Sequence, residues 1–200
     1  MSCNAVELPL TYRPSKKFEQ ILMALKATVY KADLQISDMD RHYYHNHSLT
    51  LAQHPSETLG RMMIRLLVFT LHAHEDLALT RGLSSDEEPD IWIKLPTGEI
   101  DTWIDLGQPD EKRIKKACGR AREVFIYTYS QRSAEVWWQQ INTKLTRFDN
   151  LHVIALSDEI GSSLAQLVQR TMTLQCSIQD GEAWFGDEES SVHVAPTIMK

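Results

Sequence analysis

The stretch EIDTWIDLGQPDEKRIKKACGRAREVFIYTY, residues 99–129, contains the elements that decide the fold class. Its first seven residues alternate between acidic or aromatic and mostly apolar side chains, with the two-residue period of a β-strand. Pro109 then starts a helix that extends to about Arg120, with Asp110 and Glu111 in its first turn, where the helix dipole favours negative charge. The apolar run 124–129 follows as a buried strand. A strand, a helix and a strand in this order predict an α/β domain.

Outward from this stretch, strands and helices continue to alternate. Toward the N-terminus, Leu25, Ala27 and Val29 alternate with Lys26 and Tyr30 in a predicted strand, and HYYHNHSLTLAQ reads as its hairpin partner. Further elements are a helix from the N-cap Ser56 to about Gly82, a strand at 90–94, helices at about 133–145 and 158–168, and strands at 151–156, 172–178 and 182–185. This order predicts a central mixed β-sheet flanked by helices, with a hairpin at each end.

The composition is that of a single soluble domain. Hydrophobic residues make up 42% and charged residues 24% of the 200 residues, as in ordinary globular proteins. No run of 18 apolar residues and no secretory signal is present, so we expect no membrane span. Three widely spaced cysteines without a CxxC pair fit a reducing cytoplasm. We expect 1–22 to be a loosely ordered extension, 23–195 to form the domain and 196–200 to be a tail.

Two carboxylates are expected to meet at one end of the predicted sheet. Asp105 ends the strand 99–105 just before Gly107, and open α/β sheets place ligand sites at the carboxyl ends of strands. The preceding strand of the same hairpin starts at Asp90. Converging carboxylates repel one another unless a cation lies between them, and Mg²⁺ prefers oxygen ligands. We therefore predict a site for Mg²⁺ or Mn²⁺; the alternative is that both residues are solvated acids at strand ends.

Basic residues flank this acidic pair, although the net charge is −6. Arg113, Lys116 and Arg120 lie at i, i+3 and i+7 on the helix predicted after Pro109. Glu57 and Arg61, at the start of the earlier helix, could reach the same site from another side. Nucleic acid is the partner that such a local basic patch predicts, through contacts with phosphates. Alternatively, the row is a solvated face that pairs with Asp110 and Glu123, and Glu57 is an acid favoured by the helix N-terminus.

Several long segments resemble the YaeQ family of bacterial proteins, over roughly Met23 to Val194. They are ATVYKA, LTLAQHPSETLGRMMIRLL, TRGL, EPDIWIK, IDTWIDLGQPDEKRIKKACGRA, YTY, WWQQ and RTMTLQCSIQDGEAWF. The resemblance implies a PD-(D/E)xK nuclease-like fold, a variant of the restriction-endonuclease type with added β-hairpins. Pro89-Asp90 would stand at the PD position, Asp105 at the (D/E) position and Glu57 at an acidic position of the first core helix, so that Glu57, Asp90 and Asp105 would be the metal ligands.

The chain departs from this motif at its lysine. Gly107 stands two residues after Asp105, where the motif lysine would hold the attacking water. Gln108 follows one residue later, and the charge could come from Lys116, Arg113 or Arg120 instead. The leading expectation is Mg²⁺-dependent phosphodiester hydrolysis on nucleic acid, with Gln108 and Lys116 as catalytic residues and Arg61, Arg113, Lys116 and Arg120 as phosphate contacts. The alternative is a non-catalytic, transcription-related regulator that binds nucleic acid or protein. The missing lysine favours the regulator, and the retained acids favour the enzyme.

Overall fold

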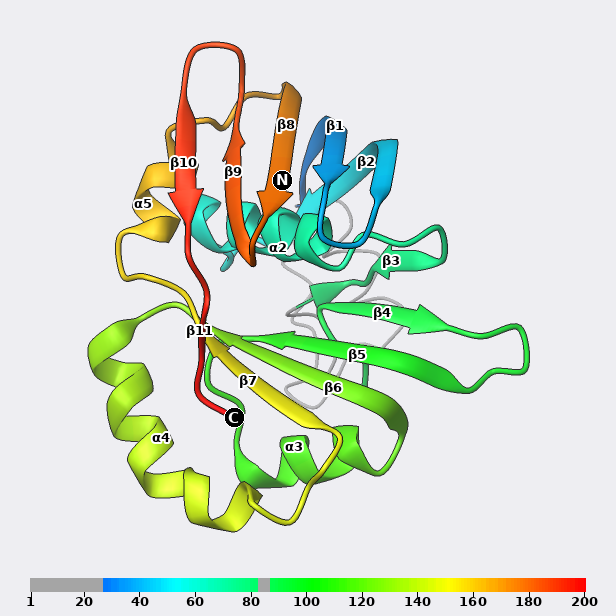
Figure 1. Cartoon of the computed structure of the whole chain (residues 1–200), viewed down its shortest axis with the longest axis vertical. Coiled ribbons are helices and arrows are strands. Elements are labelled where there is room, and N and C mark those ends of the chain that lie inside the picture. Colours follow the sequence, from blue (N-terminus) through cyan, green and yellow to red (C-terminus); the bar gives the residue numbers. More distant parts are fainter. Residues whose placement is uncertain (1–26, 83–86) are drawn as a thin grey trace, which may run out of the picture.

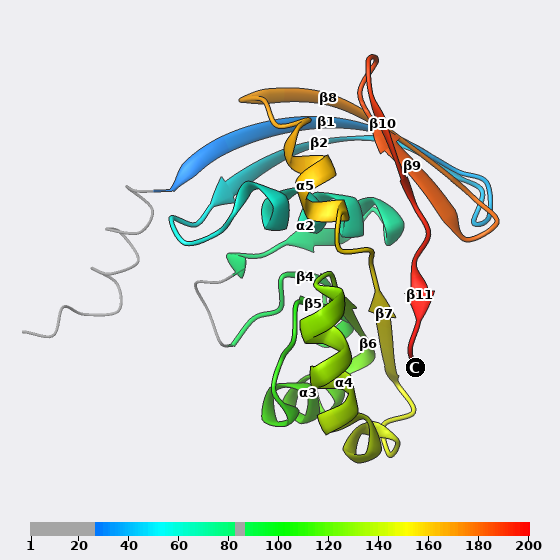
Figure 2. The same cartoon turned by 90° about the vertical axis from the view of Figure 1, so that its left-hand side faces the viewer.

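The computed structural model describes residues 27–82 and 87–200, so the segment expected as an extension, 1–22, lies outside the described residues. The fold is α/β, as expected, but it contains two β-sheets instead of one central sheet. Figure 2 shows four layers: the first sheet, then α2 with α5, then the second sheet, then α3 with α4. No helix in these two ranges is long and apolar enough to cross a membrane.

The first sheet combines the first two described strands with β8, β9 and β10, in the order β10-β9-β8-β1-β2 (Figure 1). Its strands are β1 (Thr28–Asp38), β2 (Tyr43–Gln53), β8 (Thr171–Gln179), β9 (Glu182–Gly186) and β10 (Ser191–Val194). β1 pairs parallel with β8 and antiparallel with β2. The expected register of β1 was wrong by one residue, since Tyr30 is buried and Val29 is 52% exposed. The run Ala32, Leu34, Ile36 sets the register, because a shift by one would bury Lys31 and Asp33.

The second sheet has the order β11-β7-β6-β5-β4-β3. Its strands are β3 (Leu77–Leu79), β4 (Ile91–Lys94), β5 (Ile100–Leu106), β6 (Ala121–Thr128), β7 (Leu151–Ala155) and β11 (Thr197–Ile198). β5, β6 and β7 run parallel. Both faces of β5 are packed: Ile104 and Leu106 contact the core below α2, and Trp103 belongs to the core formed with α3 and α4. The face expected to be acidic is therefore a second core face, covered by helices.

Helix α2 (Leu59–Leu71) is shorter than predicted at both ends. Its N-cap is Thr58, whose Oγ1 accepts from the Arg61 backbone N–H at 3.2 Å, rather than Ser56. The helix ends at Leu71 instead of near Gly82, because residues 77–79 pair with β4 as β3. Every residue from 62 to 70 is buried, since α2 lies between the two sheets.

The other helices in the described part of the chain are α3 (Glu111–Cys118), α4 (Gln131–Leu145) and α5 (Ile160–Ala165). Asp110 caps α3 by accepting from the Arg113 N–H at 2.7 Å, and the helix ends before Gly119. Arg120, expected inside this helix, lies beyond its end. α5 packs closely on α2, where a Cβ added to Gly60 would lie 2.7 Å from the Gly161 carbonyl oxygen.

A partly buried hydrogen bond joins the end of α2 to the second sheet. The Nε2 atom of His72, at the end of α2, lies 2.8 Å from the Tyr127 hydroxyl of β6, and the His72 ring packs 4.4 Å from the Phe125 ring. Burial, with smaller effects of Arg41 and His152, lowers the pKa of His72 to about 3. Burial also raises the pKa of Tyr127, so both groups are neutral at pH 7.

Because the folded pKa of His72 lies below its unfolded value near 6.5, acid favours the unfolded state. Its contribution to stability is complete above about pH 6.5 and falls as the pH drops toward 3. The free energy of unfolding, measured with urea, should fall between pH 7.5 and pH 5. We expect this fall to be smaller in His72→Gln than in wild type by about 1–2 kcal/mol. His74→Gln changes an exposed neighbour and is the control; it should lose as much unfolding free energy between pH 7.5 and pH 5 as wild type does. If His72→Gln loses as much unfolding free energy on acidification as wild type, His72 does not have a lowered pKa in the folded protein.

Candidate functional site

Four charged side chains meet at the N-terminal end of α2. The Glu57 carboxylate accepts from Arg61 Nη1 at 2.7 Å and from Arg65 Nη2 at 3.0 Å. Arg61 Nη2 also donates to both carboxylate oxygens of Asp90, at 2.8 and 2.9 Å. The Glu57, Arg65 and Asp90 residues are at most 5% exposed. Two carboxylates and two guanidinium groups thus form a buried network without net charge.

The surroundings of this network shift the pKa values of the two arginines in opposite directions: burial outweighs the attraction of Glu57 and Asp90 and lowers the pKa of Arg65. Burial acts to lower the pKa of Arg61, but the Asp90 and Glu57 carboxylates raise it above its ordinary value. The hydroxyl of Tyr129 forms a hydrogen bond with Arg61, while burial raises the pKa of this tyrosine. Gly82 lies against the network with a φ of 57°, and a Cβ there would lie 3.0 Å from Arg65 Nη1. A side chain at this position would therefore disturb the arginine and also strain the backbone.

Asp90 connects this network to the second sheet. Its backbone N–H donates to the Ile104 carbonyl at 3.0 Å, and its Oδ2 accepts from the Leu106 N–H at 2.9 Å. Asp90 therefore adjoins Asp105 in the β4–β5 pairing, as the sequence predicted for the ends of these strands. Its carboxylate, however, binds Arg61 of α2, on the upper side of the sheet.

Asp105 is paired on the opposite side of the sheet. Both of its oxygens accept from Arg113 of α3, from Nε and Nη2, at 2.8 Å each. Arg113 Nη2 also donates to the Glu88 carbonyl at 2.9 Å, and the guanidinium carbon lies 5.9 Å from the centre of the Trp103 ring. Bidentate pairing of this kind fixes the carboxylate firmly. The expected phosphate contact Arg113 is thus a partner of Asp105.

The three expected metal ligands do not form a joint binding site in this arrangement. Glu57, Asp90 and Asp105 each accept hydrogen bonds from an arginine, and Asp90 and Asp105 bind different helices. Among residues 27–82 and 87–200, no group of three or more His, Cys, Asp or Glu side chains is placed to hold a metal ion. A cation would have to replace the guanidinium groups to use these oxygens.

The remaining basic residues lie on the outer side of α3 and just beyond its end. Lys116 Nζ contacts the Glu87 carboxylate at 2.7 Å, and Arg120 Nη1 lies 3.6 Å from the same group. The Glu87 side chain is 76% exposed, so it is easily displaced from both cations. Lys112 and Lys115 are exposed on the same helix. The segment 112–122 contains six cations, Lys112, Arg113, Lys115, Lys116, Arg120 and Arg122, of which Arg113 is paired with Asp105 and Arg122 lies on β6.

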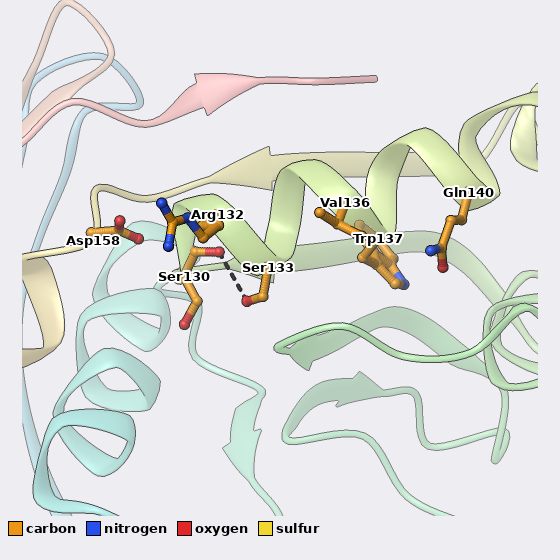
Figure 3. Close-up of a pocket in the computed structure, with 7 residues that line it drawn as sticks. All are labelled: Ser130, Arg132, Ser133, Val136, Trp137, Gln140 and Asp158. Atoms are coloured by element: carbon orange, nitrogen blue, oxygen red, sulfur yellow. Dashed lines mark hydrogen bonds between the residues drawn. The ribbon is translucent and has the colours of Figure 1, made fainter.

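Gln108 points away from the carboxylates and toward α4. Its Nε2 donates to Ser133 Oγ at 2.8 Å, in a surface position. This contact borders an open groove of about 690 Å³ at the start of α4 (Figure 3). The groove is lined by Ser130, Arg132, Ser133, Val136, Trp137, Gln140 and Asp158. Trp137 is held there by a hydrogen bond from its Nε1 to the Pro109 carbonyl at 2.9 Å.

The residues predicted for the site included Glu57 and Arg61 but not Arg65. The i, i+4, i+8 spacing of these residues was the signal, and the structure joins all three. Tyr129 and Gly82 had no comparable signal, because they reach the network from distant loops.

Comparisons with known proteins agree on one family. A model of the YaeQ family, described as "YaeQ protein", matches residues 23–196. The "Uncharacterized protein YaeQ" of Escherichia coli (strain K12) is 50% identical over 178 residues, 89% of this chain and 98% of that protein. The crystal structure of YaeQ protein from Xanthomonas axonopodis pv. citri has a TM-score of 0.84 and 50% identity over 87% of this chain and 98% of its own. That of YaeQ protein from Pseudomonas syringae has a TM-score of 0.83 and 30% identity, over 88% and 97%.

The ion-pair network predicts that replacing Asp90 destabilises the protein much more than replacing Asp101. Asp90→Ala leaves Arg61, whose side chain is 11% exposed, without its bidentate partner, and should lower the free energy of unfolding by about 3 kcal/mol or more. Asp101→Ala is the control: its partner Arg122 is 3.8 Å away and 81% exposed, so the loss should stay below about 1 kcal/mol. Urea unfolding measures both. Equal losses would contradict the structural role of Asp90.

Proposed function

The chain belongs to the YaeQ family, and from the pairing of its acidic side chains we propose that it binds nucleic acid through the surface of α3 without cleaving it. One observation carries this proposal: Lys112 and Lys115 of α3 and Arg120 just after it are exposed cations close together in a chain with net charge −6. A protein with this balance attracts phosphates only through a local patch. Lys112 and Lys115 are the first contacts that we propose, because both are exposed.

The neighbouring groove suits the rest of a nucleotide. Gln108 and Ser133 connect the end of β5 to the start of α4, where Arg132 adds a cation and Trp137 and Val136 add apolar surface (Figure 3). A base can pack on aromatic surface while its phosphate binds a cation, in a manner tolerant of sequence. We propose that a strand runs from α3 toward this groove.

We further propose that the second sheet, with α2 and α3, is a variant of the PD-(D/E)xK nuclease-like fold. The adjacency of Asp90 and Asp105 in β4–β5 and the link from Asp90 to Glu57 through Arg61 support this assignment. In this proposal the arginines replace the metal as partners of the three carboxylates. The acidic residues of the motif would then stabilise the fold instead of binding a metal ion.

Metal-dependent phosphodiester hydrolysis is the second candidate function. The same adjacency of Asp90 and Asp105 favours it, since carboxylates at neighbouring strand ends can supply oxygen ligands to one cation. It requires that Arg61 and Arg113 release these carboxylates, which the buried position of Asp90 makes costly.

Binding should depend steeply on salt and on two lysines. We expect fluorescence anisotropy with a labelled DNA duplex to give a linear fall of log K with log salt. Lys112→Gln/Lys115→Gln should reduce this slope by about 2, since each lost phosphate contact removes about 0.9. The matched control Lys31→Gln/Lys94→Gln removes the same charge from exposed positions on other elements and should leave the slope unchanged. Equal effects of both double variants would contradict binding at α3.

The same samples distinguish the two candidate functions. Wild-type protein incubated with duplex or single-stranded DNA or RNA, in Mg²⁺ or Mn²⁺, should leave every substrate intact. Cleavage that disappears in Asp105→Asn would overturn the binding-only proposal and establish the second candidate.

Removal of one acidic side chain should strengthen binding. Glu87 contacts both Lys116 and Arg120, so Glu87→Gln frees these cations for phosphate. We expect up to about fivefold tighter binding, in line with the strength of exposed ion pairs. Glu188→Gln, an exposed acid in the loop between β9 and β10 of the first sheet, removes the same charge far from Lys116 and Arg120 and is the control. Unchanged or weaker binding by Glu87→Gln would show that phosphates do not use this pair of cations.

A further inference from the structure

The two sheets have four edges, and three of them are short. Among the described residues, the edge strands β3, β10 and β11 contain three, four and two residues. The fourth edge strand, β2, contains 11 residues and forms one border of the first sheet (Figure 1). Short edge strands are a common protection against pairing with other chains, and β2 lacks this protection.

The register shows which groups of β2 are directed outward. The Lys31 N–H donates to the Arg170 carbonyl, and the Met39 N–H donates to the Ile178 carbonyl. The backbone groups of odd-numbered β1 residues are therefore directed toward β8. Even-numbered residues of β1 therefore face β2. Since Leu34 stands opposite His47, the odd residues of β2 bond to β1 and its even residues direct their N–H and C=O groups outward.

This outer row is almost free of partners. It consists of the backbone groups of Tyr44, Asn46, Ser48, Thr50 and Ala52. Within the described part of the chain, only the Ala52 carbonyl among them has a partner, Arg65 Nη2 at 3.4 Å. All five residues are exposed. An edge of this length with open hydrogen-bonding groups is a template for another strand.

The side chains of β2 also lack the usual obstacles. Its sequence, YYHNHSLTLAQ, contains no Asp, Glu, Lys, Arg or Pro. Its pairing with β1 is continuous from Asp38–Tyr43 to Thr28–Gln53, without a bulge that would bend the edge away. Charges, prolines and bulges are the devices by which natural edge strands avoid association. Although the chain carries a net charge of −6, this edge presents a neutral strip.

We propose that β2 is a dimerisation edge, at which two copies of the chain pair β2 with β2, antiparallel, about a two-fold axis at Ser48. Full overlap of residues 43–53 places Ser48 opposite itself, Asn46 opposite Thr50 and Tyr44 opposite Ala52. These pairs match an amide with a hydroxyl and a large side chain with a small one, and no like charges meet.

A second copy satisfies this edge better than a foreign peptide. A single added strand would expose its own outer edge and recreate the same open row, whereas two-fold pairing leaves no long edge uncovered. The match in length and chemistry is automatic for identical strands. α3 lies in the layer farthest from the first sheet, so both α3 surfaces remain exposed in this dimer (Figure 2). The inference is thus independent of the proposed nucleic-acid binding.

The dimer can be tested by sedimentation velocity and light scattering over a concentration series. Wild-type protein should show a reversible monomer–dimer equilibrium. Ser48→Lys places two ammonium groups opposite each other and should weaken dimerisation at least tenfold. Thr173→Lys is the matched control, because this exposed residue lies on the same sheet face but on the interior strand β8. Circular dichroism and thermal unfolding verify that both variants are folded.

A pair of cysteine variants tests the register. Hydrogen-bonded residues opposite each other in antiparallel strands have Cα atoms about 5.5 Å apart, within the range that a disulfide spans. Under mild oxidation, Ser48→Cys should form a covalent dimer beyond the wild-type background, and Thr50→Cys should not, since it faces Asn46. Protein that stays monomeric at every soluble concentration overturns the proposal. A dimer that Ser48→Lys does not weaken, or a monomer that binds a synthetic peptide of residues 43–53, overturns it as well.

Discussion

The burial of α2 between two sheets is the constraint on which the rest of the molecule depends. Apolar residues surround this helix from Met62 to Phe69, so both sheets pack on it and neither can form a complete core without it. Arg61 and Arg65 enter the interior with the helix, and a buried guanidinium without a carboxylate is strongly unfavourable. Glu57 and Asp90 meet this demand. Because Asp90 also accepts from the Leu106 N–H, the same carboxylate connects α2 to β5.

Local sequence patterns were sufficient for the strand, helix and strand around Asp105, but not for the layers. The strand before Gly107 and the helix after Pro109 follow from short-range periodicity and capping, and both are present as β5 and α3. The end of α2 could not be found in this way. Leu77–Leu79 continues an apolar pattern that also fits a helix, and only its pairing with β4 makes it a strand. The division into two sheets likewise depends on α2 lying between them.

The sequence predicted which residues of the candidate site lie close together, but not which groups they bind. Alternation along β5 and the start of β4 correctly brought Asp90 next to Asp105, and helical spacing brought Glu57 next to Arg61. The identity of the partners depends on packing that no local pattern contains. Arg113 was expected to face phosphate, yet its position above Trp103 directs it to Asp105. Tyr129 and Gly82 come from separate loops, so their approach to Arg61 and Arg65 was not visible in the sequence.

The parallel pairing of β1 with β8 affects how the chain is made. Lys31 stands opposite Thr171, so this strand pair cannot form until most of the polypeptide has left the ribosome. β1, β2 and α2 are synthesised before β8, the strand that extends their sheet, which begins only at Thr171. During this interval the apolar surface of α2 has only part of its final cover. Parallel pairing over such a separation in sequence is intrinsically slow, and apolar surface that stays exposed in the meantime favours aggregation.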